Sequence, residues 1–593
     1  MRRGFVMSVL ATALGVSAGA QAATSSLWGV QGELFDPTGR MMDWSYAGYH
    51  YGEDPLPDRA ATIEVTDHGA TGDGITDDTA AFLAALEAAA DSGGVVHVPS
   101  GTFVITDKLT LPSGVVLSGD GPGQTTLYMP SSLTDVQGNA GLEGGGTSSY
   151  AFSQAFIEGR GDVDSDPMTM VVAAAERGDD TIEVGDASGF SPGDWIRITQ
   201  TDVGGALMDR LHADLQEGGE DNIGDRGMNF HSRVASIADT TLVLERTLPV
   251  DIDLAWSPDV RPVSATVAEM GIEHLTIEFP LTTYPGHFSE QGYNAIDFRE
   301  VAHSWVRDVE ILNADYGVNV RDSYFVTVAD VVLDTTGDRG NLVGHHGLNN
   351  GHGSDNLFIG FDIRATFVHD LTNEWYATGV VFTKGRGDNL RMDHHRAAPY
   401  ATLWTELDCG AGTAPFVSGG SSNRGPHSAA YDMQWNVRAA AAMELPSDDF
   451  GPRLSFVGFQ TDATEARSRF DWWLETTDPD EIEPANIWEA MVERRLGPDD
   501  PGGGSTGGED EGGSDADDQG LDETDGDNES GDNGGPSDAD DEGLTSTTAT
   551  AGTGTGSGAS ANGTEDGCSC TTDRGPTSSG WALLLLLAVR RRR

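Results

Sequence analysis

The chain has 593 residues, and its 95 Asp and Glu residues against 34 Lys and Arg residues give a formal net charge of -61 at pH 7. This charge excludes a nucleic-acid-binding protein, because long-range repulsion opposes contact with phosphate backbones. A hydrophobic content of 38% excludes a wholly disordered chain, and three cysteines are too few for a disulfide-rich secreted module.

The first 22 residues have the three parts of a secretory signal peptide. Arg2 and Arg3 form the basic start, an apolar stretch runs from Phe5 to about Val16, and Ala20-Gln21-Ala22 is an A-x-A cleavage site. We therefore expect cleavage after Ala22, secretion of the chain, and the export machinery as one of its partners.

Short apolar segments separated by Gly and Pro turns begin near Ile63. A Gly-rich turn leads to a helix that starts at Asp77 or Asp78 and should bury Phe82, Leu83 and Leu86. Beyond Gly93-Gly94 come short strands at 95–98, 102–105, 109–111 and 115–117. Strands this short are typical of a β-solenoid, in which every strand faces a narrow core.

A repeat of 22 residues supports this interpretation. Residues 295–298 are echoed by residues 317–320, and the apolar residues Val306, Val309 and Ile311 are echoed by Val328, Val331 and Leu333. A repeat of this length signals stacked units, and 22 residues with two or three strands fit one coil of a parallel β-helix.

Residues 62–127 resemble the start of the pectate lyase superfamily. The resemblance is carried by DHGATGDGITDDTA at 67–80 and by GVVHVPSGTF at 94–103. It implies an all-β fold, a right-handed parallel β-helix over about residues 55–497 with an N-terminal capping helix. Residues 171–250 are similar to a small β-rich insertion seen in some bacterial members. Because the superfamily includes lyases, polygalacturonase-like hydrolases, epimerase-like proteins and phage tailspikes, the resemblance implies a polysaccharide partner without fixing the reaction.

The stretch 380–400 is basic for so acidic a chain, and an anionic polymer needs such a local reversal of the field. A uronate lyase needs a cation to neutralise the substrate carboxylate and a base to remove the neighbouring proton. Lys384 or His395 is the predicted base, and Arg396 and Arg386 are the predicted carboxylate binders. The whole predicted site consists of catalytic Lys384, His395 and Arg396, substrate-binding Arg386, Arg391, His394, Trp404 and His427, and the Ca²⁺ ligands Asp388 and Asp393.

Other interpretations of these residues remain open. Residues 384–396 can form a solvated turn with local ion pairs. Gly351-His352-Gly353 is similar to the Gly-His-Gly motif of polygalacturonases, although the paired-Asp motif that should precede it is not recognisable. A hydrolase would use two carboxyl groups from Asp362, Asp370, Asp388, Asp393 and Asp408. A metal site would draw on His345, His346, His352, His369, His394, His395 and His427.

Near the end of the solenoid, aromatic residues are expected to cap its open end, which would otherwise be an exposed edge. They are Trp472, Trp473 and Trp488, with Ile487 and Met491 beside them. From 498 to 566 the chain is nearly all small and polar, with 20 acidic residues and no Lys or Arg, which predicts a disordered acidic linker.

Residues 567–593 combine Gly567-Cys568-Ser569-Cys570, an apolar run from Trp581 to Val589 and four terminal arginines. The apolar run is too short to span a bilayer as a helix, which needs about 20 residues. This order resembles the myxobacterial-type sorting tail, MYXO-CTERM. The resemblance implies processing at Cys568 by sorting machinery and association with the cell surface or outer membrane.

Together these patterns predict a secreted, surface-attached enzyme that cleaves an acidic, uronate-containing polysaccharide by β-elimination, with Ca²⁺ as its expected cofactor. The alternatives are a polygalacturonase-like glycoside hydrolase and a noncatalytic glycan-binding adhesin, since solenoids also serve as binding surfaces. The oligomeric state is left open.

Overall fold

The computed structural model describes residues 23–201, 204–219 and 227–497. The predicted signal peptide with Ala22, the acidic linker, and the tail with Cys568 lie outside these residues. Among the described residues, no helix has the length and apolar character needed to cross a membrane.

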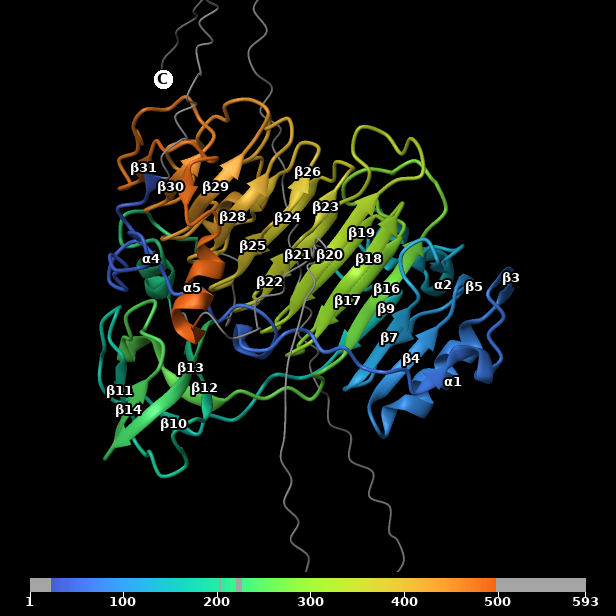
Figure 1. Cartoon of the computed structure of the whole chain (residues 1–593), viewed down its shortest axis with the longest axis horizontal. Coiled ribbons are helices and arrows are strands. Elements are labelled where there is room, and N and C mark those ends of the chain that lie inside the picture. The colour runs from blue at the N-terminus through green and yellow to red at the C-terminus, as the bar shows by residue number, and fades with distance from the viewer. Residues whose placement is uncertain (1–22, 202–203, 220–226, 498–593) are drawn as a thin grey trace, which may run out of the picture. The chain divides into compact units, whose positions relative to one another are not determined.

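Parallel strands of successive coils lie side by side along the main body, from the N-terminal coils in blue to the C-terminal coils in orange (Figure 1). The body is the predicted right-handed parallel β-helix. Ile296 lies opposite Val318 in the next coil, which confirms the 22-residue repeat. One wall of the coils, here called sheet 1, contains β6 (Leu109–Thr110), β9 (Ile157–Arg160), β17 (Asn294–Arg299), β19 (Tyr316–Arg321), β21 (His346–Gly351), β24 (His369–Glu374) and β27 (Met392–His394).

The other walls of the coils form one continuous ladder, here called sheet 2. Its side chains and those of sheet 1 meet in a long apolar core. The strands of sheet 2 are β2 (Ile63–Glu64), β3 (Asp73–Asp77), β4 (Gly94–Val98), β5 (Gly101–Val104), β7 (Val115–Gly119), β8 (Thr125–Tyr128), β16 (Gly271–Glu278), β18 (Trp305–Leu312), β20 (Thr327–Asp334), β22 (Leu357–Ile359), β23 (Asp362–Ile363), β25 (Val381–Thr383), β26 (Arg386–Gly387), β28 (Leu403–Asp408), β29 (Met433–Arg438), β30 (Ser455–Phe459) and β31 (Trp473–Glu475).

A column of residues in the left-handed conformation bends sheet 2 at the same place in each coil. Asp308 and Asp330, with φ of 52° and 53°, are aligned in β18 and β20. The next two coils place Gly360 and Lys384 there, with φ of 74° and 51°. Residues other than Gly, Asn and Asp rarely adopt this backbone conformation. The position of Lys384 is therefore set by the corner of the coil.

The predicted capping helix is α1 (Thr79–Ala90), and it buries Phe82 and Leu86 against the first coils. Leu83 was expected to be buried as well, but it lies on the outer side of the helix and is 43% exposed. Asp78 precedes the helix, and its Oδ1 accepts a 2.7 Å hydrogen bond from the Thr71 amide. This contact fixes the Gly-rich turn onto the start of the helix.

The β-rich insertion between β9 and β16 forms a separate antiparallel sheet. Its apolar face packs with residues of the N-terminal segment and of α5 (Ile487–Leu496) in a second core. The insertion contains α4 (Ala206–Leu211) and the strands β10 (Thr169–Met170), β11 (Thr181–Glu183), β12 (Trp195–Thr201), β13 (Gly227–Ala238), β14 (Thr241–Leu244) and β15 (Asp259–Pro262).

The C-terminal aromatic residues divide into two groups. Trp472 packs on Phe456 of the last coils, with ring centroids 5.8 Å apart, as expected of an end cap. By contrast, α5 lies along the side of the coils, where Asn486 at its start donates a 2.7 Å hydrogen bond to Thr383 Oγ1 of β25. The prediction that Trp488 caps the open end was therefore wrong, because its helix covers sheet 2 instead.

Candidate functional site

The structure separates the two side chains predicted to act as the base. Lys384 lies at the corner of sheet 2, and its Nζ is 2.5 Å from Glu489 Oε1 of α5. His395 directly follows β27 in sheet 1, is 2% exposed, and places Nδ1 2.6 Å from Asp393 Oδ2. An incoming polymer cannot reach so buried an imidazole, so the interpretation of His395 as the base is corrected. Lys384 is an ion-paired corner residue.

Two predicted sugar contacts belong to the apolar core. Trp404 is fully buried and stacks on Phe382, with ring centroids 4.4 Å apart. His394 points inward as well, with Nε2 3.0 Å from the buried Asp432 carboxylate. Neither side chain presents a surface to a ligand, because the inward-facing positions of β27 and β28 fill the coil.

The remaining basic residues of the predicted site make local contacts. Arg386 donates to Asp362 Oδ2 at 2.6 Å, Arg391 donates to the Phe367 carbonyl oxygen at 3.1 Å, and Arg396 lies 2.9 Å from His427 Nε2. For Lys384 and Arg386, the alternative of a solvated turn with local ion pairs therefore describes the structure.

The two predicted Ca²⁺ ligands are also separated. Asp388 is exposed beyond β26 of sheet 2, whereas Asp393 is fully buried on β27 of sheet 1. Within the described part of the chain, Asp393 belongs to a group of possible metal ligands with His369 and His395, and Asp388 does not. The two candidate Ca²⁺ ligands therefore lie on different walls of the coils and do not share a site.

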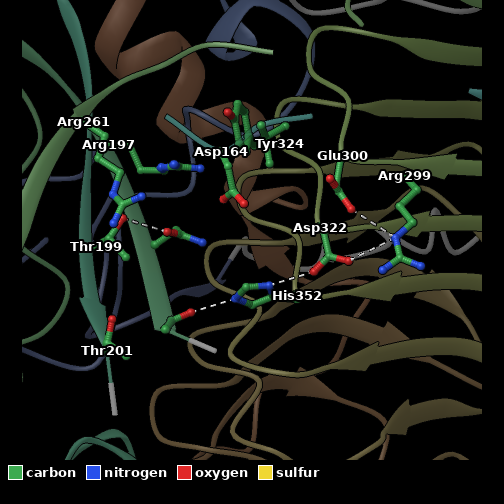
Figure 2. A pocket seen from close by; sticks show the side chains of 13 residues that line it. Asp164, Arg197, Thr199, Thr201, Arg261, Arg299, Glu300, Asp322, Tyr324 and His352 are labelled. Carbon is green, nitrogen blue, oxygen red and sulfur yellow. Dashed lines mark hydrogen bonds and ion pairs between the residues drawn. The ribbon is translucent and has the colours of Figure 1, made fainter. Parts of the chain in front are cut away.

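A cavity of about 330 Å³ lies between the insertion and the corner that follows sheet 1 (Figure 2). We call it the arginine pocket. The insertion supplies side chains from β12, β13 and β15, and the coils supply side chains that follow β17, β19 and β21. It is lined by Val163, Asp164, Arg197, Thr199, Thr201, Gly227, Asn229, Arg261, Arg299, Glu300, Asp322, Tyr324 and His352.

The alternation of β12 directs one of its faces into the pocket. Ile196 and Ile198 enter the core of the insertion, so Arg197 and Thr199 lie on the opposite face. Arg197 stands directly opposite Arg261 of β15, a like-charge pairing that destabilises a sheet. Asp259 binds both Nε and Nη2 of Arg261, at 2.7 and 2.8 Å, and this neutralises only one of the two arginines.

Arg197 is the exceptional residue of the pocket. Its side chain is 4% exposed, and among the described residues no carboxylate oxygen lies within 4.0 Å of its guanidinium. Its Nε has no hydrogen-bond partner there, and burial lowers the pKa of the guanidinium. A buried cation without a counterion is costly unless a ligand neutralises it. Arg197 is therefore placed to bind an anionic group.

The opposite wall consists of Glu300, Asp322 and His352, which occupy the same corner position in three successive coils. All three are left-handed, with φ of 56°, 51° and 53°. His352 Nδ1 lies 2.9 Å from Asp322 Oδ1, and Nε2 donates to the Gly227 carbonyl oxygen at 2.7 Å. Burial alone would raise the pKa of Asp322, but the hydrogen bond to His352 and the nearby positive charges lower it well below its usual value.

A row of arginines leads along sheet 1 to this wall. Arg160, Arg299 and Arg321 are aligned on β9, β17 and β19. The side chains of Arg160 and Arg299 are 40% and 35% exposed, and Arg299 Nε lies 3.2 Å from Glu300 Oε1. Stacked coils repeat every 4.7–4.9 Å, so this row is matched to an extended polymer rather than to a compact ligand.

Comparison with known proteins relates the first coils to carbohydrate-active proteins. Residues 62–160 match the family described as rhamnogalacturonase A/epimerase, pectate lyase-like. Mannuronan C5-epimerase AlgE1 of Azotobacter vinelandii is 37% identical over 108 residues, which are 16% of this chain and 8% of the epimerase. The pre-neck appendage protein of Bacillus phage phi29 is 48% identical over 71 residues, 12% of this chain and 8% of that protein. The family match ends before the first pocket residue, Val163.

Solved structures with a similar course of the chain include phage and bacterial proteins. The tailspike gp49 of Pseudomonas phage LKA1 aligns with a TM-score of 0.40 and 14% identity over 67% of this chain and 70% of its own. The A-module of mannuronan C-5 epimerase AlgE4 from Azotobacter vinelandii aligns with a TM-score of 0.26 and 12% identity over 70% of this chain and 98% of its own.

Of the pocket residues, only His352 was predicted from the sequence, through Gly351-His352-Gly353. Arg197 and Arg299 were not predicted. A signal for Arg299 was present, because Arg299 and Arg321 occupy the same position in the 22-residue repeat. No comparable signal existed for Arg197. The pocket wall opposite it is formed by residues of the coils, which belong to a different sheet.

Proposed function

We propose that the arginine pocket binds a uronate unit of an acidic extracellular polysaccharide and that the protein cleaves this polymer by β-elimination. The buried Arg197, which has no counterion among the described residues, is the single observation that carries the proposal. Arg160 and Arg299 line the approach along sheet 1, where their guanidinium groups are shared with the carboxylates of Glu158 and Glu300 and are partly exposed to an incoming polymer.

In this reaction Arg197 neutralises the uronate carboxylate, which makes the proton on the adjacent C5 more acidic. His352 is the proposed proton-transfer residue, because it lines the pocket, Asp322 holds its Nδ1, and its Nε2 points to the insertion, where it donates to the Gly227 carbonyl oxygen. Nε2 must first give its proton to water and lose its contact with the Gly227 carbonyl oxygen. It then accepts the C5 proton, the bond from C4 to the glycosidic oxygen breaks, a C4–C5 double bond forms, and the leaving oxygen takes a proton from water.

Epimerisation at C5 is the second candidate, since it begins with the same proton removal. It is favoured by the similarity to mannuronan C5-epimerases over 108 residues. Hydrolysis has less support, because one carboxyl group must stay protonated as the acid. The pKa of Asp322 is lowered, and Glu300 is paired with Arg299.

The test incubates the full chain with a panel of uronate polymers and measures ultraviolet absorbance of unsaturated sugars, new reducing ends and C5 configuration by NMR. We expect absorbance and reducing ends to rise together, and a His352→Gln variant to lose both by about 100-fold or more. His97→Gln is the control, because both ring nitrogens of His97 are also hydrogen-bonded, in its case to Glu64 and Asp120, but His97 lies in the first coils.

C5 inversion without absorbance would assign the epimerase reaction to the same pocket. Reducing ends without absorbance would replace the proposal by hydrolysis, and a polymer retained intact would replace it by the adhesin function. Export and surface attachment belong to the proposal, since the substrate is extracellular. Native protein that keeps Met1 and stays inside the cell would contradict this part.

A further inference from the structure

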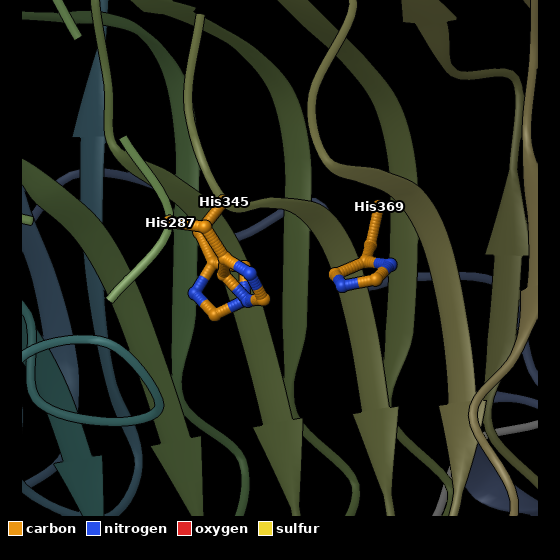
Figure 3. Close-up of side chains that lie close together, drawn as sticks. All are labelled: His287, His345 and His369. Carbon is orange, nitrogen blue, oxygen red and sulfur yellow. The ribbon is translucent and has the colours of Figure 1, made fainter. Parts of the chain in front are cut away.

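A cluster of three histidines, two of them buried and one half-buried, lies on sheet 1, away from the arginine pocket. His345 and His369 stand at the starts of β21 and β24, and His287 comes from the loop 279–293 between β16 and β17 (Figure 3). The ring centroids of His287 and His345 are 4.4 Å apart, and those of His345 and His369 are 5.5 Å apart. His345 and His369 are only 1% and 2% exposed.

The ring nitrogens of these histidines are largely unsatisfied: among the described residues, both nitrogens of His345 and of His369 are buried without a hydrogen-bond partner. A carboxylate faces Nδ1 in two of them, with Asp393 Oδ2 2.8 Å from His369 and Glu290 Oε1 3.4 Å from His345. The Nε2 atoms of His287, His345 and His369 are buried and have no hydrogen-bond partner among the described residues. Three such atoms in one place are unusual, because buried polar groups are normally satisfied.

We propose that His287, His345 and His369 bind a divalent transition-metal ion of the Zn²⁺ class. One ring nitrogen from each residue lies within 4.8 Å of the others. Ligand atoms of a tetrahedral ion at about 2.1 Å are about 3.4 Å apart, so ring nitrogens separated by up to 4.8 Å need to approach by at most about 1.4 Å. Carboxylates against the second nitrogen orient metal-binding imidazoles in this way.

The protonation state of the rings agrees with this site. Metal binding requires neutral imidazoles. Burial, and after it the neighbouring His369 and His395, lowers the pKa of His287 to about 3. Burial likewise lowers the pKa values of His345 and His369, which favours their neutral forms.

A second group, His369 with Asp393 and His395, is less suited to a metal ion. The Gly419 amide donates to Asp393 Oδ1 at 2.8 Å, and a Cβ at Gly419 would lie 2.5 Å from His395 Cε1 and 2.6 Å from His369 Cε1. The backbone therefore occupies that side of the rings. Asp393 acts as the carboxylate that orients His369 toward the first group.

The buried location gives the ion a structural role. His345 and His369 lie in neighbouring coils, and His287 lies on the loop 279–293, which contains no strand. A bound ion would fix this loop onto sheet 1. The metal site shares no residue with the arginine pocket, so either proposal can fail alone.

The test uses the full chain with Cys568→Ser and Cys570→Ser. These substitutions remove two thiols that lie close together in the sequence and could compete for the metal. After chelation, the protein is reloaded with Zn²⁺ or Co²⁺. Bound metal is measured by elemental analysis, Co²⁺ geometry by visible absorption, and stability by thermal unfolding. We expect one equivalent, a tetrahedral-type Co²⁺ spectrum and a higher Tm with metal.

His287→Gln is the decisive variant, since its loop position spares the strands. It should lose the Co²⁺ spectrum, weaken Zn²⁺ binding by about tenfold or more, and abolish the metal-dependent rise in Tm. His212→Gln is the matched control, because His212 is fully buried with an unpartnered Nε2 but belongs to neither histidine group. The proposal is overturned if the parent protein binds no stoichiometric metal, or if His287→Gln binds as the parent does.

Discussion

An Arg197→Gln variant is expected to lose activity on the uronate polymer by about 100- to 1,000-fold, the effect of removing one donor that stabilises developing negative charge. The same variant should keep its stability or gain about 1 kcal/mol, because it removes a buried cation that faces Arg261 across the strand pair. Activity is measured as kcat/KM from the initial absorbance rate, and stability as the free energy of unfolding in urea.

A loss of activity together with unchanged or increased stability would show that Arg197 binds the ligand and does not support the fold. Arg197→Lys should retain part of the activity, since it keeps the charge but not the planar donors. Arg467→Gln is the control, because the Arg467 side chain is 81% exposed and, among the residues that the structure describes, forms an ion pair only with Glu465. If Arg197→Gln lost several kcal/mol of stability while the folded protein kept its activity, Arg197 would be a structural residue.

An Arg339→Met variant is expected to lose about 3–5 kcal/mol of stability. Arg339 and Asp315 are both fully buried, with Nη2 2.7 Å from Oδ1. The other Asp315 oxygen accepts hydrogen bonds from the backbone amides of residues 291–293, at 3.1 to 3.2 Å. Arg339 also donates to the Thr282 carbonyl oxygen at 2.9 Å. Without the guanidinium, a charged carboxylate stays buried and the loop that carries His287 loses its support.

Urea unfolding and hydrogen exchange of the amides at 291–293 measure this effect. Arg467→Met makes the same chemical change in an exposed pair with Glu465, where the side chains are 81% and 63% exposed. It should change the free energy of unfolding by less than about 1 kcal/mol. Equal shifts in the two variants, or unchanged exchange at 291–293 in Arg339→Met, would show that the buried pair does not hold the loop.

Most of the fold was predictable because a solenoid repeats its pattern in the sequence. The apolar spacing between Val306 and Val328 is the spacing of two stacked coils, and the register confirms it. The capping helix was predictable for a different reason, because its turn and its apolar face are encoded by neighbouring residues of the sequence. Leu83 shows the limit, because periodicity places an apolar residue on a helix without stating which side the coils cover.

The site was less predictable, because charge composition does not report which residues meet. Lys384 and Arg386 form a basic stretch in the sequence, yet each finds its own carboxylate, on Glu489 and Asp362. The arginine pocket combines residues of an inserted sheet with three successive corners, such as Arg197 and His352. The sequence does not show that these elements lie close together.

The most direct test of the central claim compares binding of a uronate oligosaccharide with binding of its carboxyl-reduced, neutral counterpart by isothermal titration calorimetry. If Arg197 binds the carboxylate, the full chain should bind the acidic sugar, with an affinity that falls as salt is added, and should bind the reduced sugar about tenfold or more weakly. Arg197→Gln should abolish this preference. Equal binding of the two sugars, or a preference that survives in Arg197→Gln, would show that Arg197 does not bind the carboxylate.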